Sequence, residues 1–117
     1  MSSTTILSHI RKGSSTMSKV AIWARIPLRP GVREEAAKPL QVAIDNANGE
    51  EGTLLYILHE NAADPDALFF YDLYADADAL TAHSSGEGMK VLGGILKEFG
   101  AGRPEMQMLT PIIGKGL

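Results

Sequence analysis

The residue of this sequence best suited to acid–base chemistry is His83, because histidine is the side chain that exchanges protons most readily near neutral pH. It follows the aromatic run 69–74 and a short predicted helix that begins at Asp76. Ser84 and Glu87 then have the spacing of a capping box, which predicts the start of a second helix. We therefore expect His83 at the junction of two helices, facing a pocket if the protein has one.

Aromatic side chains upstream of His83 could form the wall of such a pocket. Tyr56 lies in an apolar segment, and Phe70 and Tyr74 belong to a segment with four aromatics in six positions. Such residues favour a pleated surface that is covered on at least one side. Tyr56, Phe70 and Tyr74 could hold a flat ligand, but they would serve equally well as core residues, so both interpretations stay open.

Two further residues are of interest as pocket or interface residues. Asp72 stands in the apolar aromatic segment, where a carboxylate must find a polar partner, and Arg25 or Arg103 is the obvious one. An ion pair is the first interpretation of Asp72, and a polar contribution to the pocket is the second. Trp23 alternates with the core residues of its own strand, which indicates either packing at a dimer interface or a place in the pocket wall.

The other chemically active residue types support no metal site. His59 ends a predicted strand and is followed by Glu60 and Asn61, so we expect it on a solvated rim. A site made of His59 and His83 lacks a third ligand, whereas catalytic zinc sites ordinarily use three protein ligands. The sequence has no cysteine, which excludes disulfides, thiolate catalysis and cysteine-ligated zinc.

Composition limits the class of protein. The 117 residues are enough for one domain, and 44% hydrophobic with 21% charged residues is an ordinary globular balance. A net charge of −3, with no basic cluster larger than Arg11-Lys12, argues against binding to nucleic acid. No apolar run approaches the roughly 20 residues that cross a bilayer. We expect a cytoplasmic protein that is not bound to a membrane.

The chain divides into three parts by composition. Residues 1–17 are rich in Ser and Thr and are predicted to be a disordered or flexible N-terminal extension. Residues 18–113 hold the apolar periodicities and are predicted to form the folded domain. Residues 114–117 are predicted to be a tail.

The folded part reads as β-α-β-β-α-β, which is typical of a ferredoxin-like α+β domain with a four-stranded antiparallel sheet and both helices on one face. The predicted elements are strand 20–28, helix 32–47 kinked at Pro39, strand 53–60, a turn at 64–66, strand 67–74, helical segments 76–83 and 85–99, and strand 105–113. The strands are apolar on both faces. A bare apolar face is larger than a monomer normally exposes, so we expect a homodimer formed through the open sheet face.

Several short motifs carry a resemblance to a known family. They are Pro30-Gly31 before the first helix, Tyr56, Asp64-Pro65-Asp66, Asp72-x-Tyr74, Leu80-x-x-His83 and the closing apolar strand. Together they resemble the antibiotic biosynthesis monooxygenase (ABM) family of the dimeric α+β barrel superfamily, over about residues 19–111. The resemblance implies a homodimer whose two sheets pack into a barrel, with a pocket in each subunit between sheet and helices.

The resemblance also implies an activity. Family members include monooxygenases that act on quinols and polycyclic aromatic phenols with molecular oxygen and without metal or flavin. A deprotonated phenol can pass an electron to dioxygen itself, so the protein need only bind, desolvate and deprotonate the substrate. His83 would then be the base or a hydrogen-bond donor, and Asp72 a polar anchor. The family's haem-degrading branch has different residues at the positions of Ala24, His83 and Gly93, so haem degradation is disfavoured.

Two other functions remain open at this stage. The same fold could be a non-catalytic dimeric module that binds a small aromatic metabolite. It could also support isomerase- or dehalogenase-like handling of small aromatics, because fold alone does not determine function.

Overall fold

The computed structural model describes residues 18–117, and the predicted extension at residues 1–17 lies outside them. The elements follow in the order β1 (Val20–Pro27), α2 (Arg33–Ala37), α3 (Leu40–Asn48), β2 (Thr53–Asn61), β3 (Asp64–Tyr74), α4 (Ala77–Ser84), α5 (Glu87–Phe99) and β4 (Glu105–Leu109). None of the helices in this part of the chain is long and apolar enough to span a membrane.

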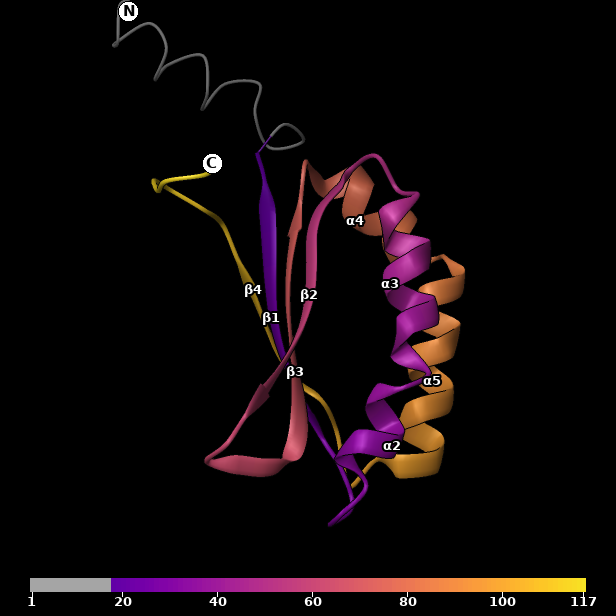
Figure 1. The fold of residues 1–117 in the computed structure, drawn as a ribbon. Coiled ribbons are helices and arrows are strands. Elements are labelled where there is room, and N and C mark those ends of the chain that lie inside the picture. The colour runs from indigo at the N-terminus through magenta and orange to yellow at the C-terminus, as the bar shows by residue number, and fades with distance from the viewer. Residues whose placement is uncertain (1–17) are drawn as a thin grey trace, which may run out of the picture.

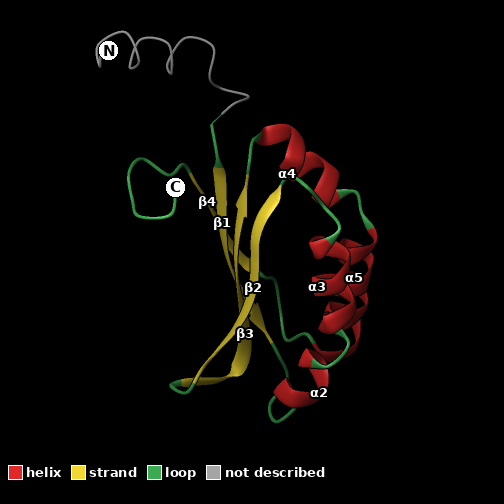
Figure 2. Ribbon diagram, turned by 45° about the horizontal axis from the view of Figure 1, so that its top comes forward, coloured by secondary structure: helices red, strands yellow, loops and turns green. Residues whose placement is uncertain are grey.

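The four strands form one antiparallel sheet in the order β2-β3-β1-β4. Strands β1 and β3 pair along their length, from Val20 opposite Tyr74 to Pro27 opposite Ala67. All the helices lie on the same side of the sheet, so the molecule has a helix layer, a sheet and an open sheet face (Figures 1 and 2). The predicted ferredoxin-like α+β fold is confirmed.

Alternation along the strands decides which side chains meet the helices. In β1, Ile22, Ala24 and Ile26 are buried, and the last two belong to the core beneath the helices. Trp23 and Arg25 alternate with them and are half-buried on the open face. Because successive residues of a strand point to opposite faces, the two groups cannot share one pocket.

The first helical region is broken rather than kinked. One helix over 32–47 is predicted, but α2 ends at Ala37 and α3 begins at Leu40, with Pro39 as its N-cap. Proline lacks a backbone N–H and its ring clashes with the preceding turn, which is enough to end a helix of this length. The apolar stripe survives the break, since Ala36, Leu40 and Ala43 are all buried.

The turn between β2 and β3 lies two residues earlier than predicted. Asp64, Pro65 and Asp66 begin β3, and the turn is at Ala62 and Ala63. Asn61 stabilises it, because its side-chain oxygen accepts a hydrogen bond from the Ala63 backbone N–H at 2.9 Å. The pairing of β3 with β1 extends only to Ala67, so the missing N–H of Pro65 leaves no gap in that ladder.

The predicted capping box at Ser84 and Glu87 is wrong. Helix α4 begins after Asp76, whose side chain accepts from the Ala79 backbone N–H at 2.8 Å, and it continues to Ser84. Helix α5 begins at Glu87 after Gly86 without a side-chain cap, and the Glu87 carboxylate instead pairs with Lys90. His83 is thus in the last turn of α4, still next to the start of α5.

The C-terminal region also differs from the prediction. Strand β4 ends at Leu109 rather than Ile113. The strand pairs with β1 only as far as Ala21 opposite Leu109, so the ladder holds no partner for a longer strand. Residues 110–117 follow the strand as a loop with a turn at Lys115 and Gly116, and they line a groove on the open face together with Leu55, Tyr71 and Leu73.

Candidate active site

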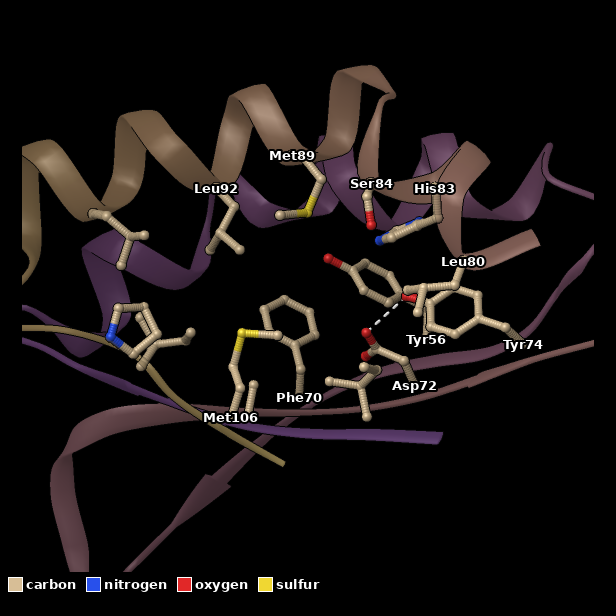
Figure 3. Close-up of a pocket in the computed structure, with 15 residues that line it drawn as sticks. Tyr56, Phe70, Asp72, Tyr74, Leu80, His83, Ser84, Met89, Leu92 and Met106 are labelled. Carbon is tan, nitrogen blue, oxygen red and sulfur yellow. Dashed lines mark hydrogen bonds between the residues drawn. The ribbon is translucent and has the colours of Figure 1, made fainter. Parts of the chain in front are cut away.

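A cavity of about 150 Å³ lies between the sheet and the helix layer (Figure 3). Its walls are mainly apolar, and the polar groups come from four residues of the predicted site and from Ser84. The lining residues are Ile22, Ala24, Ile26, Tyr56, Phe70, Asp72, Tyr74, Leu80, His83, Ser84, Met89, Leu92, Leu96, Pro104 and Met106.

The structure brings the predicted aromatic wall and His83 together. The rings of Tyr56 and Phe70 stack with centroids 4.8 Å apart and an interplanar angle of 18°. The His83 ring stands edge-on to Tyr56 at 4.7 Å and lies 5.2 Å from Tyr74. Strands β2 and β3 place these aromatics on one face because Tyr56 pairs with Asp72 in register. A flat ligand in the cavity would therefore meet aromatic and imidazole surfaces together.

His83 is buried in the cavity wall, with 3% of its surface exposed. Its Nδ1 lies 2.8 Å from Oε1 of Glu50, a residue in the turn between α3 and β2. The other ring nitrogen, Nε2, points into the cavity (Figure 3). The ring thus connects a carboxylate behind it to the space where a ligand would sit.

Glu50 is a site residue that the sequence analysis missed. Its carboxylate also accepts hydrogen bonds from Thr53 Oγ1 at 2.8 Å and from Asn46 Nδ2 at 3.1 Å. Two adjacent glutamates in a turn ordinarily indicate a solvated loop, and 33 positions separate Glu50 from His83. The nearby Gly52 is the available signal: a Cβ there would collide with Ala79, so glycine permits α4 to approach this turn.

Asp72 does not pair with arginine. Its Oδ2 accepts a hydrogen bond from the Tyr74 hydroxyl at 2.8 Å, and its buried Oδ1 has no hydrogen-bond partner within residues 18–117. The predicted partner Arg25 lies on the opposite face, where it binds Asp64 at 2.7 Å and Glu105 at 2.9 Å. Burial raises the pKa of Asp72 to about 6, partly offset by the Tyr74 hydrogen bond and by the nearby His83 ring.

The two tyrosines of the cavity are held in their protonated form. Burial, with the nearby Asp72 carboxylate, raises the pKa of both Tyr56 and Tyr74 well above the ordinary tyrosine value. The Tyr74 hydroxyl is already committed to Asp72. The Tyr56 hydroxyl points into the cavity and is available as a neutral donor to a ligand (Figure 3).

Trp23 and His59 do not join the cavity. Trp23 lies on the open face, where its ring is 6.1 Å from that of Phe69. His59, which is exposed as predicted for a rim position, lines a shallow surface groove together with Trp23 and Phe69. Trp23 is therefore not part of the pocket wall, and its packing at a dimer interface stays a prediction. In the part of the chain that the structure describes, no three His, Asp or Glu side chains are grouped to hold a metal ion.

The model of the antibiotic biosynthesis monooxygenase (ABM) family matches residues 20–92, from the start of β1 into α5. The protein belongs to this family. The matched segment includes the cavity's aromatic wall, Asp72, Glu50 and His83. Proteins of the ABM family are typically dimeric. A search of proteins with curated functions found no match.

Solved structures of other proteins share this fold. NE2512, a protein of unknown function from Nitrosomonas europaea, is 24% identical with a TM-score of 0.75, covering 86% of this chain and 95% of its own. Rv0793 from Mycobacterium tuberculosis is also 24% identical, with a TM-score of 0.75 and coverage of 85% and 100%. A proposed antibiotic biosynthesis monooxygenase from Caulobacter crescentus CB15 is 22% identical, with a TM-score of 0.76 and coverage of 90% and 100%.

Proposed function

We propose that this ABM protein is a cofactor-independent monooxygenase that uses molecular oxygen to oxidise a small phenol or quinol bound in the cavity. The observation that carries the proposal is the position of His83, whose Nε2 points into a cavity walled by aromatic rings. A buried base beside an aromatic surface is what deprotonation of a bound phenol requires.

The reaction balances without an external reductant. His83 takes the phenolic proton, and the phenolate passes one electron to dioxygen. The resulting radicals join at a ring carbon and give a hydroperoxide after protonation. Loss of water from that carbon leaves a quinone, so one oxygen atom enters the product and the other leaves as water. All four electrons that reduce dioxygen come from the substrate, and the protein supplies binding, desolvation and proton transfer.

The cavity residues have distinct roles in this proposal. Tyr56, Phe70 and Tyr74 form the wall on which the ring of the substrate lies. The unpaired Oδ1 of Asp72 accepts a hydrogen bond from a second polar group of the substrate, since a buried acceptor without a partner is costly. The volume of about 150 Å³ equals that of a protein cavity known to hold benzene, which favours a single ring over a polycyclic substrate.

We also propose a homodimer through the open face of the sheet. Trp23, Phe69 and Tyr71 stand on this face, and Leu55 and Ile57 beside them are 41% and 42% exposed. A contiguous apolar surface of this kind marks an interface. A second copy would cover it without obstructing the cavity, because the cavity lies between the sheet and the helices, which all cover the other face (Figure 1).

The alternative is a module that binds an aromatic metabolite without turnover. It is favoured by the aromatic wall, which needs no catalysis to hold a ligand. Saturable binding without oxygen consumption, measured by isothermal titration calorimetry, would identify this function.

Oxygen uptake tests the enzyme proposal. Wild type, His83→Ala and His59→Ala would be compared on a panel of single-ring phenols and quinols. Loss of the base is expected to lower turnover by roughly 10²–10⁴-fold. His59→Ala is the matched control because it removes an exposed histidine outside the cavity, and its rate should equal that of wild type. Equal rates for His83→Ala and wild type would remove His83 from the mechanism.

A further inference from the structure

We infer that Glu50 is the positioning residue of this site: it holds the proton of His83 on Nδ1 and leaves Nε2 as the acceptor that faces the cavity. The inference rests on the proposed function for its purpose, since a base must present a lone pair to the substrate. Its structural part stands independently, because it concerns which ring nitrogen of His83 carries the proton.

The hydrogen bond between the two residues determines the tautomer. A neutral imidazole has a proton on one nitrogen and a lone pair on the other. An ionised carboxylate can only accept, so at 2.8 Å from Glu50 Oε1 the Nδ1 atom of His83 must be the donor. The lone pair is then on Nε2, which points into the cavity (Figure 3). With the opposite tautomer, two acceptors would face each other at Glu50.

The Glu50 carboxylate is itself fixed in place. Thr53 Oγ1 donates a hydrogen bond to Oε1, the same oxygen that accepts from His83 Nδ1. Asn46 Nδ2 donates to Oε2. These partners come from β2 and α3, whereas His83 comes from α4. Three elements thus converge on one carboxylate, and its orientation does not depend on the ligand.

The same carboxylate would favour the product of proton transfer. Once His83 takes a proton from the ligand, its positive charge lies beside the negative charge of Glu50. Such charge-assisted hydrogen bonds are about twice as strong as neutral ones. The Glu50 side chain is 22% exposed and His83 only 3%, so the charged imidazole is buried with its counter-ion directly behind it.

Nitrogen NMR measures the tautomer directly. Long-range proton–nitrogen correlations on uniformly ¹⁵N-labelled protein would be recorded for wild type, Glu50→Gln, Glu50→Met and Glu51→Gln, with His83→Ala used to assign the signal. Wild type is expected to show neutral His83 protonated on Nδ1. Glu50→Gln should keep this tautomer because the amide oxygen still accepts, and Glu50→Met should lose it. Glu51→Gln, which removes the neighbouring exposed charge, should match wild type.

Turnover measurements distinguish a positioning role of Glu50 from a purely structural role in the turn between α3 and β2. Relative to wild type, kcat is expected to fall about 10- to 100-fold in Glu50→Gln, which loses the charge, and further in Glu50→Met, with KM little changed. A purely structural role would instead lower stability in both variants and leave the tautomer of the folded fraction as it is in wild type.

Two results would overturn the inference: a wild-type His83 protonated on Nε2, or a folded Glu50→Met that keeps the wild-type tautomer. The wild-type spectrum decides the question even if Glu50→Met does not fold. Failure of the proposed function is a different observation. If no phenol or quinol is consumed while the tautomer follows Glu50 as expected, Glu50 positions His83 but the oxygenase proposal is wrong.

Discussion

The two faces of the sheet are both rich in aromatic residues but differ in what surrounds them. On the helix-covered face, Phe70 and Tyr74 surround a cavity that also holds Asp72 and His83, which are 7% and 3% exposed. On the open face, Trp23 packs on Phe69, and Arg25 pairs with the carboxylates of Asp64 and Glu105. Aromatic content therefore does not locate the site. The site is instead located by titratable groups that are buried beside the aromatic residues.

The pKa values of two aspartates, Asp72 and Asp64, also differ between the two surroundings. Burial raises the pKa of Asp72 to about 6, whereas the hydrogen bond from Arg25 lowers the pKa of Asp64. Asp72 is buried on the helix-covered face without a cationic partner, whereas Asp64 is paired with Arg25. A protein that keeps an uncompensated carboxylate in an apolar cavity loses stability there, which is typical of functional positions.

Replacing one apolar residue on each face is expected to give the largest effects. Phe70→Ala should lower the free energy of unfolding by about 3–5 kcal/mol, because it opens a void in the core. Ile57→Asp should leave the fold intact and convert the proposed dimer to monomers, since like charges facing each other across an interface cost several kcal/mol. Urea unfolding and sedimentation velocity measure the two effects. Loss of association in Phe70→Ala with none in Ile57→Asp would contradict the assignment of the faces.

The two aspartates should respond to pH with opposite signs. The folded-state pKa of Asp72, about 6, exceeds its ordinary value of 3.8, so the native state binds more protons between those values and loses stability as pH rises through them. Asp72→Asn should thus be more stable than wild type by about 1–3 kcal/mol at pH 8 and equal to it near pH 4. Tyr74 can still donate to the side-chain oxygen of the substituted amide, so packing is preserved.

Asp64→Asn is the matched comparison for that experiment. Because the pKa of Asp64 is lowered, its contribution to stability is present above its ordinary pKa and is lost as pH falls through the lowered value. This variant should be less stable than wild type at pH 8, with the difference shrinking in acid. Urea unfolding at pH 4, 6 and 8 measures the stability of both variants relative to wild type. The same dependence on pH for both variants would contradict the predicted difference in sign.

The smallest effect concerns the outward face of α5. Gly93 and Gly94 are exposed on this helix, and a Cβ at either would meet nothing within 4 Å. Gly93→Ala or Gly94→Ala should stabilise the protein by about 0.5–1 kcal/mol, since glycine is a poor helix former. Gly100→Ala should destabilise it, because the new Cβ would collide with the Leu96 carbonyl oxygen. Thermal unfolding measures all three.

Much of the fold was predictable because it depends on local patterns. Period-two alternation separates Ala24 and Ile26 from Trp23, and the same rule puts Phe70 and Tyr74 together with Tyr56 once the strands pair. Element boundaries were less predictable. Pro39 ends a helix rather than bending it, and α5 begins after Gly86 without the cap predicted at Ser84, because competing local signals differ by only about 1 kcal/mol.

The sequence by itself determined the order of the elements and the residues assigned to each face of the sheet, since these follow from periodicity along a single segment. Only the tertiary structure decided the partners of the polar groups. Glu50 reaches His83 because α4 packs against the turn at Gly52, and Asp72 binds Tyr74 because Arg25 projects from the other face. A hydrogen bond between distant segments depends on how two elements dock, and no pattern within either segment encodes that distance.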